Sequence, residues 1–132
     1  MHESDRNISV QKLKNLVRVF CEKRDWDQYH SPKDLAIGVV TEAAELLDLF
    51  RFKSEVQSKA LLKDKKKRRQ VAEELADVLY FLLRFAQMYE FDLYQELTRK
   101  VRVNGRKYPV NRVKGHNLKY TEYSKGDRQG RK

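Results

Sequence analysis

The sequence predicts an all-α protein built as a unit of four helices. Apolar residues recur at intervals of three and four, which is the spacing of one face of an α-helix. No segment alternates apolar and polar residues as a half-buried strand does. With 132 residues, 40% of them apolar, the chain can form one modest core and has no room for a second large domain.

The first two helices are predicted from an apolar face and from a start signal. A helix from about Ser9 to Lys23 carries Val10, Leu13 and Val17 on one face. A second helix is expected from the run Ser31-Pro32-Lys33-Asp34 to about Phe52. This run offers a hydroxyl cap, a proline at the first helical position and an acid in the first turn.

The last two helices follow a basic segment that is predicted to be a loop. The third helix is expected over roughly residues 65–89, on its apolar periodicity. The run Asp92-Leu93-Tyr94-Gln95 resembles a capping box and begins a fourth helix that is expected to end near Val103. Gly105 and Pro109 are then expected to end regular structure.

Positive charge is concentrated at the C-terminal end. The helical domain is expected over residues 9–110, and a basic extended tail over residues 111–132, of which at least 124–132 are expected to be disordered. Residues 99–132 hold twelve Lys or Arg and two Asp or Glu, so the net charge of +10 belongs to this segment. Such a segment attracts nucleic acid or nucleotide phosphates, but it can also serve only solubility.

Cysteine content and hydropathy favour a cytoplasmic protein. No apolar run approaches the length of a membrane span, and the first residues lack the apolar region of a signal peptide. The single cysteine, Cys21, excludes an intramolecular disulfide and fits a reducing compartment. Its apolar neighbours favour core packing over reactivity.

Two acidic pairs lie inside apolar helical segments: Glu42 with Glu45, and Glu74 with Asp77. Residues three apart share a helix face, so each pair projects two carboxylates in one direction. Carboxylates that lose hydration beside one another are unstable unless a cation pairs with them. Mg²⁺ prefers oxygen ligands and bridges carboxylates to phosphates. The pairs therefore favour a magnesium site.

A solvated acidic face is the alternative interpretation of either pair taken alone. Neither pair has a basic partner one turn later in its own helix, since Leu49 follows Glu45 and Phe81 follows Asp77. The absence of such partners weakens a salt-bridge explanation. Two pairs of the same form shift the interpretation toward metal binding.

Several blocks of residues occur in the order typical of one known family. They are Arg24-Asp25-Trp26-Asp27-Gln28-Tyr29-His30-Ser31-Pro32, Glu42-Ala-Ala-Glu45-Leu, Phe50-Arg-Phe-Lys53, Glu73-Glu74-Leu-Ala-Asp77-Val, Lys100-x3-Asn104 and Lys107-Tyr108-Pro109. In these blocks the chain resembles the MazG-like all-α nucleoside triphosphate pyrophosphohydrolases, and most of all their small dCTP pyrophosphatase branch. The resemblance spans about Val10 to Tyr123.

The resemblance implies a reaction, a metal and an assembly. The family hydrolyses the α–β phosphate bond of nucleoside triphosphates, which serves nucleotide pool control or house-cleaning. Mg²⁺, for which Mn²⁺ can substitute, is held by the four carboxylates, which are the expected catalytic residues. Glu42 is the candidate that orients or deprotonates the water. A homodimer or homotetramer is expected, with helices of two or more subunits completing each bundle and pocket.

The resemblance also implies substrate contacts on both sides of the acidic pairs. Phosphate, sugar or base contacts are expected at Lys100, Asn104 and Lys107, and aromatic walls around the base at Trp26 and Phe52. The candidate set is completed by His30, Lys53 and Phe81. The alternatives are core packing for the aromatic residues, a generic basic surface for the lysines and a structural role for His30.

The chain departs from the dCTP-hydrolysing relatives at three positions. Those relatives carry Trp, Tyr and His where this chain has Phe52, Phe81 and Val17. Because buried hydrogen-bonding groups give the strongest discrimination between substrates, the base preference is left open. The alternative function is a non-catalytic helical module that binds nucleic acid or a partner through the basic tail.

Overall fold

The computed structural model describes residues 2–123, and the expected disorder of residues 124–132 lies outside this range. The described chain divides between Phe91 and Asp92 into two compact units. The first unit contains α1 (Val10–Glu22), a 3₁₀ turn (Asp27–Tyr29), α2 (Pro32–Phe50), α3 (Glu55–Leu61) and α4 (Lys65–Met88). The second contains α5 (Leu93–Lys107), α6 (Val110–Val113) and a 3₁₀ turn (Tyr120–Glu122). The predicted all-α class is confirmed, since no strand occurs in residues 2–123.

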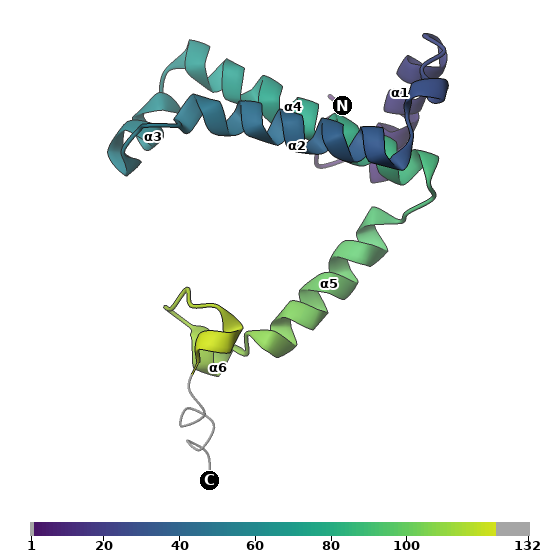
Figure 1. Cartoon of the computed structure of the whole chain (residues 1–132). Helices are drawn as coiled ribbons and strands as arrows, with labels where there is room; N and C mark the ends of the chain where they lie inside the picture. Colours follow the sequence, from purple (N-terminus) through teal and green to yellow (C-terminus); the bar gives the residue numbers. More distant parts are fainter. Residues whose placement is uncertain (1, 124–132) are drawn as a thin grey trace. The chain divides into compact units, whose positions relative to one another are not determined.

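The first unit is organised around the antiparallel pair α2 and α4, which lie side by side along their lengths (Figure 1). The N-terminal helix α1 also packs on α4. A small core is shared by these helices and α3, and its buried apolar residues are Val17, Cys21, Leu35, Leu61, Val71, Leu83 and Ala86. The longest helix, α4, is therefore the element on which α1 and α2 converge.

Gly38 allows the close approach of α2 to α4. A Cβ atom added at Gly38 would overlap the ring of Phe81. The ring of Phe81 is half-buried and also meets Tyr80 edge-to-face, with 5.1 Å between centroids. A side chain at position 38 would thus separate the two helices that carry the acidic pairs.

Side-chain caps begin the helices at the predicted signals. The hydroxyl of Ser31 accepts from the backbone N–H of Asp34 at 3.1 Å, with Pro32 as the first helical residue. The carboxylate of Asp92 accepts from the N–H of Gln95 at 2.9 Å. Each cap satisfies a donor that the first turn leaves without a partner.

Three expectations about the elements differ from the structure. Regular structure does not end at Pro109, because the segment expected to be extended contains α6 and the 3₁₀ turn Tyr120–Glu122. The segment after α2, expected to be a loop, contains α3, which a capping box between Ser54 and Gln57 begins. The expectation that α5 ends near Val103 and that Gly105 stops it was wrong, because α5 continues to Lys107. A helix accepts glycine at a modest cost, so α5 passes through Gly105. It ends only before Pro109, because a residue that precedes a proline disfavours helical backbone.

No helix in the described part of the chain has both the length and the apolar character that crossing a membrane requires.

Candidate active site

Three of the four predicted carboxylates come together between α2 and α4. Glu42 and Glu45 lie one turn apart on α2, and Glu74 faces them from α4. Each offers one carboxylate oxygen, and these three oxygens lie within 4.8 Å of one another. Asp77, one turn after Glu74, is not part of this close set. After loss of hydration on burial and the effects of Glu45, the charge of Asp77 also raises the pKa values of Glu42 and Glu74.

The cluster has unneutralised negative charge. Loss of hydration on burial, followed by the hydrogen bond to Glu45 and the charges of Glu45, Asp77 and Glu74, raises the pKa of Glu42 to about 7. Burial, followed by the charge of Glu45, also raises the pKa of Glu74. None of the ion pairs formed within residues 2–123 involves these carboxylates.

Two oxygens of the cluster are shielded from solvent and have no hydrogen-bond partner: Oε2 of Glu42 and Oε2 of Glu74. Buried polar atoms are almost always paired in folded proteins, so such orphans require an explanation. A hard divalent cation is one, because it takes several oxygen ligands and neutralises their charge. The residues present therefore fit Mg²⁺ or a similar ion.

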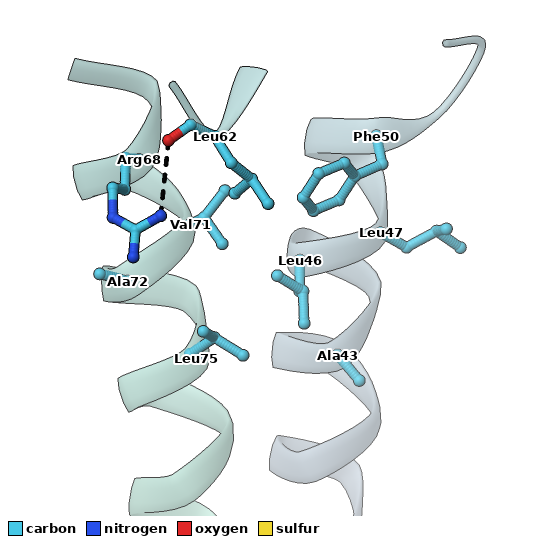
Figure 2. A pocket seen from close by; sticks show the side chains of 9 residues that line it. All are labelled: Ala43, Leu46, Leu47, Phe50, Leu62, Arg68, Val71, Ala72 and Leu75. Carbon is cyan, nitrogen blue, oxygen red and sulfur yellow. Dashed lines mark hydrogen bonds between the residues drawn. The ribbon is translucent and has the colours of Figure 1, made fainter. Parts of the chain in front are cut away.

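An apolar pocket of about 610 Å³ lies beside the carboxylates, between the C-terminal half of α2 and the N-terminal half of α4. Figure 2 shows Leu46 and Phe50 of α2 directed toward Val71 and Leu75 of α4, whereas Leu47 points away from α4. The lining residues are Ala43, Leu46, Leu47, Phe50, Leu62, Arg68, Val71, Ala72 and Leu75. Since Ala43 and Leu75 adjoin Glu42 and Glu74 in sequence, the acidic cluster and the pocket share the same helical segments.

Trp26 and His30 flank the 3₁₀ turn of the first unit. The ring of Trp26 meets Phe20 at a centroid distance of 5.7 Å and His30 at 6.5 Å, both edge-to-face. The Nδ1 atom of His30 accepts a hydrogen bond from Nε of Arg84 at 2.9 Å. Burial, followed by the charge of Arg84, lowers the pKa of His30. The structure thus gives His30 a protein partner on α4.

Phe52 and Lys53 lie in the connection between α2 and α3. Phe52 has a positive φ of 64° and its side chain is 92% exposed. The guanidinium of Arg51 lies 4.6 Å from the centre of its ring. Positive φ is strained for a bulky aromatic residue, and strained residues of this kind cluster in turns and at functional sites. Lys53 is exposed next to the Ser54 cap.

Of the remaining substrate candidates, Phe81 lies on α4 with its ring against Gly38, and the other three belong to the second unit. Lys100, Asn104 and Lys107 are four and three residues apart on α5 and so share one face of this helix. The ammonium of Lys107 lies 5.1 Å from the centre of the Tyr120 ring. The structure therefore brings these three together on one helix, in a unit other than that of the carboxylates.

The sequence reasoning overlooked Arg84, whose side chain is only 1% exposed and contacts Asp27, His30 and Gln87. A signal was present, because Arg84 is a lone cation in the apolar run Leu82-Leu83-Arg84-Phe85-Ala86. A charge on a buried helix face requires a partner, and this requirement could have identified it.

Known proteins resemble this chain in sequence and in fold. The MazG-like family matches residues 37–123, a range that contains both acidic pairs. The dCTP pyrophosphatase 1 of Mus musculus is 34% identical over 118 residues, which cover 89% of this chain and 69% of that protein. The dCTP pyrophosphatase 1 of Homo sapiens is 31% identical with the same coverage.

A solved structure is similar over most of the chain. The crystal structure of a pyrophosphatase from Archaeoglobus fulgidus is 34% identical and superposes with a TM-score of 0.72, covering 83% of this chain and 98% of that chain. This chain belongs to the MazG-like family.

Proposed function

We propose that this chain hydrolyses the α–β phosphate bond of (deoxy)nucleoside triphosphates and releases a monophosphate and pyrophosphate. The observation that carries the proposal is the cluster of Glu42, Glu45 and Glu74, with its two orphaned oxygens, in a chain similar to dCTP pyrophosphatases. Displacement at phosphorus requires positioning and charge neutralisation more than covalent help from the protein.

We assign Glu42, Glu45, Glu74 and Asp77 as the residues that hold Mg²⁺, or Mn²⁺ in its place. When bound, the metal would supply charge neutralisation for the phosphates and activation of a water. The protein's part is to fix the carboxylates on two packed helices, so that they do not rearrange during the reaction. We assign to Glu42 the additional role of orienting or deprotonating the attacking water.

The proposed substrate contacts are Trp26 and Phe52 around the base, together with Lys100, Asn104 and Lys107 on the phosphates and sugar, and His30, Lys53 and Phe81 as further contacts. Two relatives are named for dCTP, which supports a dCTP-like substrate. At Phe52, Phe81 and Val17 this chain lacks the polar groups of the dCTP-hydrolysing relatives, and this argues for a broader base preference. We further propose a cytoplasmic homodimer or homotetramer.

A panel of nucleoside triphosphates tests the reaction. The full chain is incubated with each ribo- and deoxynucleotide in Mg²⁺, and products are separated by ion-exchange chromatography. We expect monophosphate and pyrophosphate in equal amounts, no turnover in EDTA, and recovery with Mn²⁺. Diphosphate and inorganic phosphate as products would contradict cleavage between the α and β phosphates.

A further inference from the structure

Two charged side chains are buried in the described part of the first unit, Lys14 and Arg84, and the carboxylate chemistry explains neither. The Lys14 ammonium donates to the main-chain oxygen of Phe91, whereas the more deeply buried Arg84 has side-chain partners. Its side chain is 1% exposed and lies between apolar neighbours on α4. Removing a guanidinium from water is unfavourable unless its donors are paired with good geometry. The partners of Arg84 therefore show what this charge stabilises.

All three guanidinium nitrogens of Arg84 have a partner. Nε donates to Nδ1 of His30 at 2.9 Å, and Nη1 donates to Oε1 of Gln87 at 2.6 Å. Nη2 forms an ion pair with the carboxylate of Asp27. Asp27 begins the 3₁₀ turn and His30 follows it, so Arg84 ties both ends of the turn to α4. A second side chain of this region, Tyr89, donates its hydroxyl to the main-chain oxygen of His30 at 2.7 Å.

The turn determines where the ring of Trp26 lies. Trp26 immediately precedes Asp27, and its backbone N–H donates to the oxygen of Cys21 at 3.1 Å. Its ring meets Phe20 of α1 and His30, and its side chain is 38% exposed. His30 therefore contacts both the ring of Trp26 and the guanidinium of Arg84. These contacts form a continuous path from α4 to the exposed indole.

We propose that Arg84 is a positioning residue, which holds Trp26 through His30 and Asp27 as a preformed wall for the nucleotide base. The proposal rests on the proposed function, in which Trp26 contacts the base. A wall that is ordered before binding loses less conformational entropy when the nucleotide arrives. Because Glu74 and Asp77 also lie on α4, this one helix carries metal ligands and the residue that orders the base wall.

Trp26 is the only tryptophan of the chain, so its fluorescence reports directly on the turn. Arg84→Lys keeps the charge but cannot reproduce the planar set of donors. Asp27→Asn removes the ion pair at a carboxylate that is 53% exposed. Arg69→Lys, at an exposed position of α4, is the matched control. Each variant is examined by far-ultraviolet circular dichroism, acrylamide quenching of Trp26, and steady-state kinetics with the parent's best nucleotide.

We expect Arg84→Lys and Asp27→Asn to keep the helical circular dichroism and to increase the acrylamide quenching constant about two-fold, since a loosened indole is struck more often. The Michaelis constant should rise about ten-fold, with kcat within about two-fold of the parent, because binding is weakened and the carboxylates are untouched. Arg69→Lys should match the parent in all three measurements.

A double variant tests whether Arg84 acts through the indole. In a Trp26→Leu background, Asp27→Asn should change the Michaelis constant by less than about two-fold, because contacting residues are not additive. A ten-fold effect that persists in this background would contradict the proposed path.

The remaining outcomes separate this inference from the proposed function. If Arg84→Lys and Asp27→Asn are folded and acrylamide quenching is unchanged, Arg84 does not position Trp26. If quenching increases but the Michaelis constant is unchanged, the position of Trp26 does not matter for nucleotide binding. If Arg84→Lys loses its helical signal, Asp27→Asn decides the question. A parent without turnover on any nucleotide would contradict the proposed function, and the base wall that depends on it, while the quenching comparison would still decide whether Arg84 orders the turn.

Discussion

At the scale of single residues, the carboxylate cluster is a compromise between binding and stability. Three carboxylates within 4.8 Å of one another repel, and two of their oxygens have no partner. A protein without a need for a cation would have little reason to keep this arrangement. A metal ion bound by these carboxylates would offset the repulsion, because a ligand that binds only the native state stabilises it.

Replacing one ligand should therefore separate activity from stability. Glu45→Gln or Asp77→Asn should lower turnover more than about 100-fold, since each removes a metal-binding charge. Without metal, the Tm should hold or rise, because repulsion is relieved, and the increase of Tm on adding Mg²⁺ should shrink. Differential scanning fluorimetry with and without Mg²⁺ measures this.

The control for these variants is Glu73→Gln, which alters the exposed neighbour of Glu74 on another side of α4. It should keep both activity and the stabilisation by Mg²⁺. Near-parental activity in both Glu45→Gln and Asp77→Asn would refute the assignment of metal ligands.

The raised pKa of Glu42 predicts how stability depends on pH. Its ordinary value is 4.5 and its folded value is about 7. Between these values the native state holds a proton that the unfolded chain has released, so stability falls as pH rises. The free energy of unfolding of the parent, measured relative to that of Glu42→Gln, should be highest below pH 4.5 and should fall as the pH rises to about 7. Chemical denaturation of both proteins in EDTA measures the difference.

The test compares the free energies of unfolding of parent and Glu42→Gln at each pH, because His30 makes the stability of either protein rise with pH. Its lowered pKa favours the native state at higher pH, but this contribution is common to both proteins and cancels. Parallel stability curves for parent and variant across this pH range would show that Glu42 does not titrate as described. Added Mg²⁺ should weaken the dependence, since metal competes with the proton for the carboxylate.

The sequence was sufficient to pair the carboxylates within each helix, because that signal is local. Glu42 with Glu45, and Glu74 with Asp77, share a helix face by spacing alone. It did not indicate that Glu42, Glu45 and Glu74 form the closest set, since that depends on the packing of α2 on α4. The bonds from Arg84 to the turn join residues more than fifty positions apart, and no local pattern records them.

At the scale of elements, the sequence failed to predict a short helix, α3, and the C-terminal end of another, α5. α3 has seven residues, of which only Leu61 is buried, so apolar periodicity could not reveal it. Its capping box at Ser54 was the available signal. α5 passes through Gly105, which a local rule interprets as a stop although a helix accepts glycine at a modest cost.

Gly105→Ala tests the extended α5. A Cβ atom at this position meets nothing within 4 Å, so alanine should stabilise the helix by about 0.5–1 kcal/mol. Gly115→Ala is the opposite control, because Gly115 has a φ of 83° and an L-residue is strained there. Urea denaturation followed by circular dichroism should show an increase for the first variant and a decrease for the second. A loss of stability in Gly105→Ala would place the end of α5 before this residue.

Gly38→Ala tests the packing of α2 on α4. The added methyl group would overlap the Phe81 ring, and overpacking of this kind costs about 1–3 kcal/mol. A second change that shortens the opposing side chain, Phe81→Leu, should restore part of the loss, because the two sites are in contact. The Tm values of parent, single variants and double variant measure the coupling. Equal losses with and without Phe81 would show that the two residues do not meet.

At the scale of the whole molecule, the described chain buries few apolar side chains and exposes many. Its buried apolar set is small, whereas Val40, Leu47, Leu75 and Leu79 are exposed on the two helices that form the centre of the first unit. Val40 and Leu47 are seven residues apart and so share a face of α2. Contiguous apolar faces of this kind mark surfaces that another protein surface covers.

A second copy of the chain is the occupant we predict, since small helical units often complete their bundle by symmetric pairing. Multi-angle light scattering at micromolar concentration should give a mass at least twice 15.8 kDa. Val40→Gln combined with Leu47→Gln should shift the mass toward the monomer, because both polar groups would lose hydration at the interface without partners. Lys59→Gln, on the exposed surface of α3, should leave the assembly unchanged. A parent that remains a stable monomer would leave these apolar faces uncovered and would refute the prediction that the bundle is completed by another subunit.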